Sequence, residues 1–286
     1  MNKLVSMNDM LMDAEKRGYA VGAFNVNDLA GVQAVAQAAE EEHSPVIIQI
    51  YSGGINLLGT PYIAAMAQAA AQSVSVPVAL HLDHGRDLET VQTCVQGGFT
   101  SVMMDGSKLP LDENIAVTRQ AVEMAHAAGI SAEAELGRIG SGSQEVSESE
   151  KEKFLTDPEE ARRFVEETNV DALAVAIGSA HGLYKFKPSL DFDLLEEIRG
   201  KADVRLVLHG GSDLPEDQIR RSIELGITKV NVATDLAGVY TSALREVVAA
   251  SEGIIWSGRV FSAVREAMKE LVRARIRLFG STGMVS

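Results

Sequence analysis

Residues 76–105 have the sequence VPVALHLDHGRDLETVQTCVQGGFTSVMMD, in which two strand patterns flank a helical one. The runs Val76–Leu82 and Ser101–Met104 are mostly apolar, whereas Leu88–Gln96 places apolar residues at helical spacing. Strands that read as nearly continuous apolar runs are buried on both faces, which is typical of a parallel sheet covered by helices. A strand, a helix and a second buried strand therefore predict one unit of a parallel α/β fold.

The same alternation continues along the chain. The other strands are predicted at Tyr19–Phe24, Val46–Ile50, Ser131–Leu136, Ala172–Ile177, Arg205–Leu208 and Lys229–Val232. Further helices are predicted at Gly31–Glu42, Glu113–Ala128, Pro158–Thr168, Phe192–Arg199 and Glu216–Leu225, with extra terminal helices at Met7–Gly18 and Val260–Phe279. Eight strand–helix units in 286 residues favour a closed (β/α)8 TIM barrel over an open, doubly wound sheet. An open sheet would be supported by a dinucleotide fingerprint, but Gly137, Gly140 and Gly142 lack its spacing.

The chain has no Pro- or Ser-rich linker and no break in composition, so we expect residues 1–286 to form one domain. The stretch 137–156 interrupts the alternation, because it is rich in Gly, Ser, Gln, Glu and Lys. Loops longer than about 12–15 residues inside a compact domain are usually functional lids or disordered insertions. Since this stretch follows the predicted strand Ser131–Leu136, we expect a mobile loop over the active-site face of the barrel.

The composition limits the classes of function. The chain has 40 acidic and 26 basic residues and a net charge of −14, which argues against nucleic-acid binding but permits a small phosphorylated substrate. Its single cysteine, Cys94, has no partner for an internal disulfide. No run approaches the roughly 20 apolar residues of a membrane span, and Met1–Asn8 has no signal-peptide pattern. We therefore expect a cytoplasmic protein that does not associate with membranes.

Histidines stand at the ends of three predicted strands. In a TIM barrel the active site is built at the carboxyl ends of the strands. His84, His181 and His209 occupy such positions, and a glycine follows each of them. Three imidazoles converging on one mouth leave a fourth coordination position for water or substrate, so they predict a catalytic Zn²⁺ or a similar divalent metal.

Carboxylates accompany these histidines. Asp83 adjoins His84 and is interpreted as a general acid/base, with a role in orienting the metal-binding histidine as the alternative. Asp105 and Glu135 also lie at strand ends. These two carboxylates either support the histidines or bind a second metal.

Small residues follow the last two predicted strands, where phosphate sites recur in this fold. Their backbone amides and hydroxyls are suited to an anion, and the residues concerned are Gly210, Gly211, Ser212, Asn231, Val232, Ala233 and Thr234. We therefore expect a phosphorylated substrate. Asn25 and Ser52 follow two other strands and are predicted to bind the same substrate.

Five motifs distributed along the chain are specific in combination. They are His81-Leu-Asp-His-Gly85, Glu133-Ala-Glu-Leu-Gly137, Ala176-Ile-Gly-Ser-Ala-His-Gly182, Val207-Leu-His-Gly-Gly-Ser212 and Lys229-Val-Asn-Val-Ala-Thr234. With them, the chain resembles the class II, zinc-dependent fructose- and tagatose-bisphosphate aldolases over nearly its whole length. The run Phe154-Leu-Thr-Asp-Pro158 is closer to the tagatose branch.

The resemblance implies reversible retro-aldol cleavage of a ketose 1,6-bisphosphate to dihydroxyacetone phosphate and glyceraldehyde 3-phosphate. It implies that His84, His181 and His209 bind one Zn²⁺, and that Asp83 transfers the proton. Such cleavage needs a base for the C4 hydroxyl and an electron sink for the enediolate, which Asp83 and the metal provide. It further implies that Gly182 joins the two small-residue loops at the phosphate, that a monovalent cation lies nearby, and that the chain forms homodimers or homotetramers.

Three positions depart from the family pattern. The glutamate of the family's mobile loop has its nearest counterpart in Glu145, within Gly142-Ser-Gln-Glu-Val146. Near the distal end of the substrate, Tyr51 replaces a Ser or Thr and Lys108 replaces a frequent His. A class II aldolase acting on a ketose 1-phosphate with a different distal group is therefore the main alternative. A non-catalytic barrel subunit and a metal-dependent epimerase or hydrolase are the others.

Overall fold

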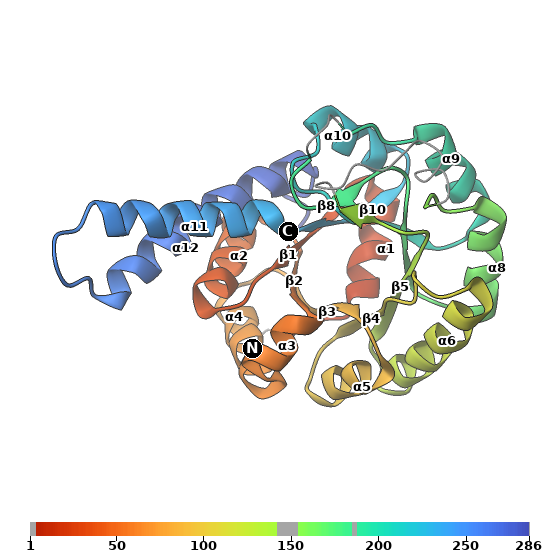
Figure 1. Ribbon diagram of the computed structural model, residues 1–286, viewed down its shortest axis with the longest axis horizontal. Helices are drawn as coiled ribbons and strands as arrows, with labels where there is room; N and C mark the ends of the chain where they lie inside the picture. The colour runs from red at the N-terminus through yellow and green to blue at the C-terminus, as the bar shows by residue number, and fades with distance from the viewer. Residues whose placement is uncertain (1–3, 142–153, 185–187, 286) are drawn as a thin grey trace.

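The computed structural model describes residues 4–141, 154–184 and 188–285. Within them, eight parallel strands close into a barrel in the order β1-β10-β9-β7-β5-β4-β3-β2 (Figure 1). The strands are β1 (Val21–Asn25), β2 (Val46–Tyr51), β3 (Val78–Gly85), β4 (Ser101–Met104), β5 (Ser131–Leu136), β7 (Ala172–Val175), β9 (Arg205–Leu208) and β10 (Ile227–Val232). The predicted (β/α)8 barrel is confirmed, with each strand end within a few residues of its prediction.

Helices cover the outside of the barrel. They are α2 (Leu29–Glu41), α3 (Ser52–Leu58), α4 (Thr60–Ser73), α5 (Leu88–Gln96), α6 (Leu111–Ala127), α8 (Pro158–Thr168), α9 (Phe192–Lys201), α10 (Glu216–Glu224), α11 (Thr234–Ala249) and α12 (Ser257–Leu278). Aspartates cap several of their first turns: Asp28 accepts from the Gly31 amide at 2.8 Å, and Asp87 from the Thr90 amide at 2.7 Å. These bonds satisfy amides that have no partner at a helix start, and they fix where α2 and α5 begin.

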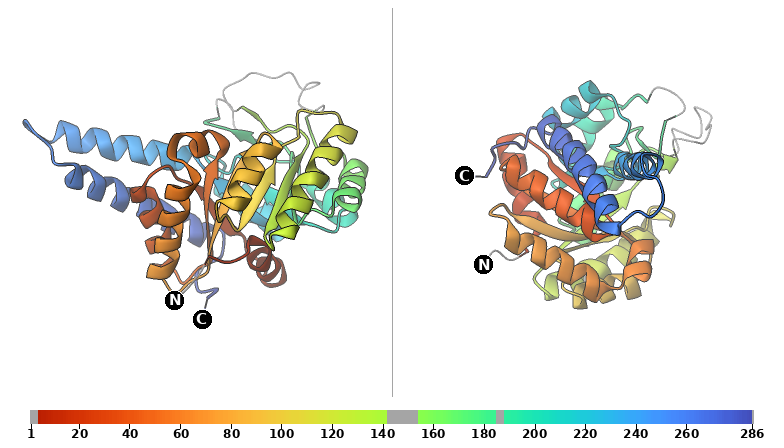
Figure 2. Two further views of the ribbon diagram at one scale, coloured as in Figure 1. Left: turned by 90° about the horizontal axis from the view of Figure 1, so that it is seen from below. Right: turned by 90° about the vertical axis from the view of Figure 1, so that its left-hand side faces the viewer.

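Helix α1 (Met7–Arg17) precedes the barrel and lies across its amino-terminal end (Figure 2). Met7 and Leu11 of this helix are fully buried. They belong to one apolar cluster with Ala79 of β3 and Val207 of β9, which point into the barrel. The helix therefore closes this end of the barrel and leaves the carboxyl ends of the strands as the open mouth.

Polar side chains form the next layer above this apolar base. Successive residues of a strand face opposite sides, so His81 and Asp83 share the inner face of β3 with Ala79. Lys229 of β10 is fully buried, and its Nζ lies 2.8 Å from Oε2 of Glu133 on β5. The barrel interior thus changes from apolar to polar toward the mouth.

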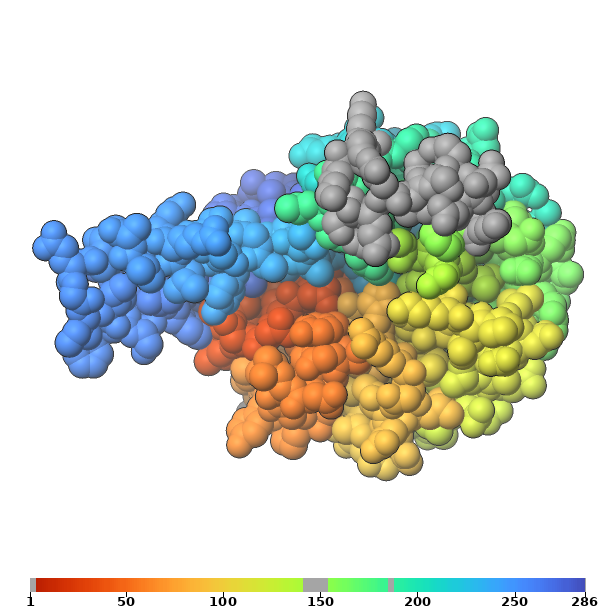
Figure 3. All heavy atoms as spheres, viewed as in Figure 1, coloured from red at the N-terminus to blue at the C-terminus, as the bar shows by residue number. Residues whose placement is uncertain are grey.

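Helices α11 and α12 form a hairpin that projects from the barrel (Figure 3). The base of α12 is held to α2 by ion pairs from Arg273 and Arg277 to Glu42. At the tip, Ile254 is 91% exposed and Trp256 is 83% exposed. Among the described residues, no helix combines the length and the apolar character that crossing a membrane requires.

Candidate metal centre and active site

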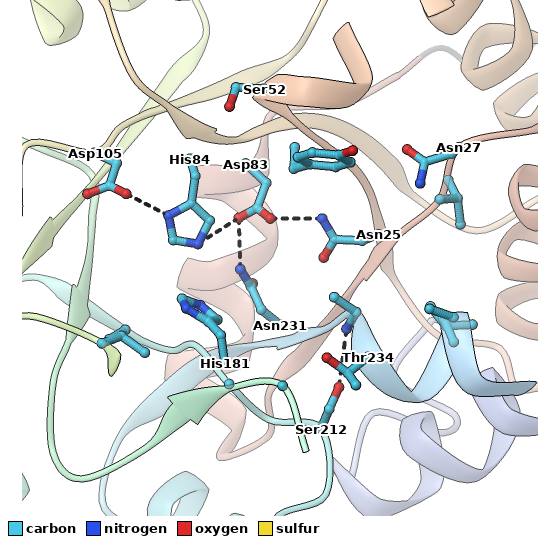
Figure 4. Close-up of a pocket in the computed structure, with 18 of the residues that line it drawn as sticks. Asn25, Asn27, Ser52, Asp83, His84, Asp105, His181, Ser212, Asn231 and Thr234 are labelled. Atoms are coloured by element: carbon cyan, nitrogen blue, oxygen red, sulfur yellow. Dashed lines mark hydrogen bonds and ion pairs between the residues drawn. The ribbon is translucent and has the colours of Figure 1, made fainter. Parts of the chain in front are cut away.

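The structure brings the three histidines together at the open mouth. Their ring centroids lie 4.8 Å apart for His84 and His209, 5.0 Å for His84 and His181, and 6.0 Å for His181 and His209. One ring nitrogen from each lies within 4.8 Å of the other two. Side chains from distant parts of the chain thus form a compact set of nitrogen donors (Figure 4).

His181 reaches this cluster differently from the prediction. The barrel strand β7 ends at Val175, so His181 does not lie at its carboxyl end. It lies instead on β8 (Ala180–His181), a separate two-residue strand that pairs with β6 (Gly140–Ser141). The Tyr184 hydroxyl accepts a hydrogen bond from the Ala180 amide at 2.7 Å and donates to the Gly210 carbonyl at 3.2 Å. These bonds hold β8 beside the loop that follows β9.

Carboxylates orient two of the three rings. Nδ1 of His84 lies 2.8 Å from Oδ2 of Asp105, and Nε2 of His209 lies 2.9 Å from Oε1 of Glu133. A ring nitrogen that donates to a carboxylate carries the proton, which leaves the other nitrogen as a free donor for a metal. The free nitrogens, Nε2 of His84 and Nδ1 of His209, lie 3.2 Å apart.

This separation fits a divalent metal. At 3.2 Å the two nitrogens need a cation between them, which is either a proton on Nε2 of His84 or a metal ion bound to both rings. Two nitrogens bound to one tetrahedral zinc ion at 2.0–2.1 Å would be about 3.3 Å apart. The donor set therefore suits a metal, with His84, His181 and His209 as the residues that would hold it.

Burial and nearby charge affect the three rings differently. Burial lowers the pKa of His209 well below its usual range and that of His181 to about 4, so both rings are neutral at pH 7. Burial acts in the same direction on His84, but Asp83 and Asp105 overcome it and raise the His84 pKa to about 10. Neutral imidazoles are ready ligands, and the anionic surroundings of His84 favour a cation, either a proton or a metal.

Asp83 is fixed as a carboxylate beside the histidines. Its Oδ2 accepts from Nδ2 of Asn25 at 2.8 Å and its Oδ1 from Nδ2 of Asn231 at 3.1 Å. Burial would raise the pKa of Asp83, but the positive charge of His84 and the Asn25 hydrogen bond hold it below its usual value. Oδ1 also lies 3.8 Å from Nε2 of His84. The arrangement presents an ionised, oriented base at the edge of the metal-binding cluster.

A second group of metal-binding side chains shares His84 with Asp105 and Glu135. Glu135 is 2% exposed, and burial raises its pKa to about 8. Its Oε2 has no hydrogen-bond partner among the described residues and lies 3.4 Å from Nδ1 of His209. A buried carboxyl oxygen without a partner, aimed at metal-binding rings, suits both of the sequence interpretations, a supporting carboxylate and a second metal position.

The two small-residue loops meet on the other side of the mouth. The Gly211 amide donates to the Asn231 carbonyl at 3.1 Å, and Ser212 Oγ accepts from the Ala233 and Asp235 amides at 3.3 Å. Gly210 has a φ of 68°, and a Cβ there would collide with the Ala180 carbonyl oxygen. Only glycine therefore allows β8 and the loop after β9 to pack this closely.

Most of the sequence-predicted residues line one cavity of about 1050 Å³. These are Asn25, Ser52, Asp83, His84, Asp105, Glu135, His181, Gly182, Gly210, Ser212, Asn231, Ala233 and Thr234. His209 lies beneath it and is fully buried, and the side chain of Val232 faces the outer core instead. Glu145 and most of the predicted loop 137–156 lie outside the described residues.

Sequence reasoning missed three residues that position the site. Glu133 orients His209, Tyr184 fastens β8, and Gln49 donates to Oδ1 of Asn25 at 2.6 Å. Glu133 lies two residues before Glu135 in the strand, and Gln49 interrupts an apolar strand. For Glu133 and Gln49, the sequence signal was a polar residue at an inward position of a buried strand. No local sequence pattern indicates the role of Tyr184.

A barrel whose mouth holds three converging histidines, an oriented carboxylate and glycine-rich loops belongs to the class of metal-dependent enzymes that act on small anionic substrates. The family model described as "Fructose-bisphosphate aldolase class-II" matches residues 5–284, so the chain belongs to this family. It is therefore a metal-dependent aldolase, a carbon–carbon lyase that acts on a phosphorylated sugar.

Solved structures agree with this assignment. The YdjI aldolase from Escherichia coli K12 is 36% identical, with a TM-score of 0.88 over 99% of this chain and 100% of that chain. A candidate fructose-1,6-bisphosphate aldolase from Coccidioides immitis is 33% identical, with a TM-score of 0.88 over 97% of each chain. The fructose-bisphosphate aldolase of Campylobacter jejuni, 23% identical over 98% of this chain and 97% of that one, shares the fold with a TM-score of 0.85.

Proposed function

We propose that the protein is a zinc-dependent aldolase that reversibly cleaves a ketose 1,6-bisphosphate, tagatose or fructose bisphosphate, into dihydroxyacetone phosphate and glyceraldehyde 3-phosphate. The observation that carries this proposal is the position of Asp83, whose Oδ1 lies 3.8 Å from Nε2 of His84. A base beside a metal ligand can reach a hydroxyl of a substrate held at the same centre.

Asp83 would take the proton from the C4 hydroxyl in the cleavage direction and return it in condensation. The amides of Asn25 and Asn231 hold both oxygens of this carboxylate, so its geometry is set before substrate binds. Zn²⁺ held by His84, His181 and His209 would supply Lewis-acid stabilisation of the negative charge that develops on the substrate. Asp105 and Glu133 would keep the His84 and His209 rings in the metal-binding orientation.

The loops after β9 and β10 would bind the phosphate of dihydroxyacetone phosphate. Backbone amides of Gly182, the loop Gly210–Ser212 and the segment Asn231–Thr234 line or adjoin the cavity there. Thr234 begins the 16-residue helix α11, and the amino terminus of a helix favours an anion. A monovalent cation beside these loops and a proton-transfer role for Glu145 also belong to this proposal.

The alternative substrate is a ketose 1-phosphate with a different distal group. It is favoured by Tyr51, which is 43% exposed and lines the cavity beside Ser52. A tyrosine ring takes up space that a Ser or Thr would leave for a distal phosphate. Steady-state kinetics with fructose and tagatose bisphosphates and with their 1-monophosphates would separate the two, since a preference for a monophosphate would contradict the bisphosphate assignment.

We also propose that the chain acts as a single cytoplasmic domain that assembles into a homodimer or homotetramer. The projecting hairpin supports assembly, because it exposes Ile254 and Trp256 at its tip and Val248 nearby. Exposed apolar side chains gathered on an extension are typical of subunit interfaces. Light scattering coupled to size-exclusion chromatography would test it, and a monomeric mass at micromolar concentration would contradict it.

A further inference from the structure

Two cationic side chains line the cavity away from the small-residue loops. Arg86 follows β3, and Lys108 follows β4. These strands are neighbours in the barrel, and the Asp105 amide donates to the Gly85 carbonyl at 2.8 Å, so the two segments are joined at their ends. Arg86 and Lys108 are both exposed to solvent.

The position of these residues relative to the small-residue loops follows from the strand order. Around the closed barrel, β4 and β3 lie diametrically across from β10 and β9. The histidine cluster and Asp83 lie between the two sides, as Figure 4 shows for Ser52 and Asp105 on one side and Ser212 on the other. A substrate whose phosphate sits at the loops after β9 and β10 would therefore extend over the centre toward Arg86 and Lys108.

These two cations also differ from most others in the protein. Arginines and lysines elsewhere mostly have a carboxylate within 4.0 Å, for example Arg163 with Asp112 and Lys269 with Glu41. Among the described residues, no carboxylate lies within 4.0 Å of Lys16, Arg86, Lys108, Arg138, Arg245 or Arg259. Of these six, Arg86 and Lys108 are the two that line the cavity. In a chain of net charge −14, two cations that have no carboxylate partner among the described residues and line the active-site cavity provide a local site for an anion.

We infer that Arg86 and Lys108 form a distal subsite that binds an anionic group, a phosphate or a carboxylate, at the far end of the substrate. The inference rests on the proposed function and adds the residues that determine specificity. Arg86 offers a planar guanidinium suited to two oxygens of the anion, and Lys108 offers a mobile point charge. In this arrangement neither residue contacts the reacting carbons, so both residues determine substrate specificity and do not take part in the chemical step.

Condensation kinetics test this subsite directly. Metal-loaded protein saturated with dihydroxyacetone phosphate is assayed with three acceptor aldehydes: glyceraldehyde 3-phosphate, 4-oxobutanoate and uncharged glyceraldehyde. Arg86→Gln and Lys108→Gln should each lower kcat/KM for the preferred anionic acceptor about 10-fold, and the double variant should lower it further than either single change. The value for glyceraldehyde should change less than about threefold. Lys16→Gln, which removes an unpaired cation outside the cavity, is the matched control and should leave all three values unchanged.

The wild-type preference between the two anionic acceptors identifies a phosphate or a carboxylate as the group bound. Equal losses on charged and uncharged acceptors would overturn the subsite, because they would indicate damage to the centre rather than lost charge recognition. If the metal-loaded wild-type protein condenses no acceptor, the proposed function fails. The subsite is then tested separately, by measuring the binding of an anionic ligand. In that case, glycerol 3-phosphate and glycerol are titrated calorimetrically into protein saturated with dihydroxyacetone phosphate. The double variant should bind glycerol 3-phosphate at least about 10-fold more weakly than wild type does. Equal binding of glycerol 3-phosphate by both proteins would overturn the subsite.

Discussion

Asp83 and His84 are consecutive residues of β3, yet both side chains point to the cavity side of the strand (Figure 4). A regular strand would turn them to opposite faces. The backbone of His84 has a φ of 49°, and the pairing of β3 with β4 shifts register between Leu82 and Gly85. This bulge re-aims His84 toward the mouth, so that a base and a metal ligand come from adjacent positions.

Asp83→Ala tests the proton-transfer role. The variant should retain stoichiometric zinc, because the three histidines remain, but lose at least about 100-fold in kcat, the scale of positioned acid/base catalysis. Elemental analysis and steady-state kinetics on the same preparation measure both quantities. A variant with wild-type turnover would remove Asp83 from the mechanism, and one without metal would assign it to metal binding.

His209→Ala should lose the metal itself. The substitution removes one of three nitrogen donors and leaves the fully buried Glu133 without its His209 partner. Zinc content after gel filtration should fall well below one per chain, and activity should fall with it. His126→Ala is the matched control, since His126 lies on α6 in an ion pair with Asp171, outside the cavity, and should keep full zinc. Full zinc in His209→Ala would exclude that residue as a ligand.

Metal binding should release protons in a pH-dependent way. Because the pKa of His84 is about 10 in the metal-free protein and that of His181 is about 4, His84 carries a proton at pH 7.5 and His181 does not. Zinc must displace the His84 proton, so apparent affinity should rise about tenfold for each pH unit up to that value. Calorimetry in buffers of different ionisation enthalpy should show at least one proton released per zinc.

Glu135 adds a second contribution to that measurement. Its pKa of about 8 means that it is mostly protonated at pH 7.5 and ionised at pH 9.5. If the incoming cation also ionises Glu135, wild type should release more protons at pH 7.5 than Glu135→Gln does, and the difference should vanish at pH 9.5. A heat of binding independent of buffer would contradict the protonated state assigned to His84.

The fold was largely predictable because each strand and helix has a local pattern. Apolar runs such as Ala172–Ile177 indicate strands buried on both faces, and aspartates such as Asp157 indicate where helices begin. A helix after Val46–Ile50 was expected, but no bounds were predicted for α4, because its alanine-rich sequence gives little contrast between a buried and an exposed face. Sequence periodicity therefore identifies an element only where its two faces differ chemically.

The site was predictable to the extent that strand ends share one mouth. That rule groups His84, His181 and His209 at the mouth, as the structure does. It does not show that His181 lies on β8, whose position depends on its pairing with β6 and on the contact between Ala180 and Gly210. It also cannot show that His84 lies in a bulge, because the register shift arises between β3 and β4. These are long-range contacts, which no local pattern in one segment records.

Glu42 should contribute to stability through its charge. It is 5% exposed at the end of α2 and accepts hydrogen bonds from Arg273 and Arg277 of α12 and from Thr282 near the carboxyl terminus. Burial would raise the pKa of Glu42, but the two arginines overcome it and hold the pKa below its usual value. Glu42→Gln should therefore lower the free energy of unfolding by about 1–3 kcal/mol near pH 7. Urea denaturation at matched pH measures this difference.

The pH dependence separates charge from packing at this position. A folded-state pKa below the unfolded value means that the stabilisation is present above pH about 4.3 and is lost as pH falls through the folded value. The difference between wild type and Glu42→Gln should therefore shrink on acidification. Glu41→Gln is the matched control, because Glu41 is 41% exposed while pairing with Arg273 and Lys269, and its effect should stay within about 1 kcal/mol. A Glu42→Gln deficit that persisted unchanged to pH 3 would mean that shape, not ionisation, makes Glu42 important to the contact between α2 and α12.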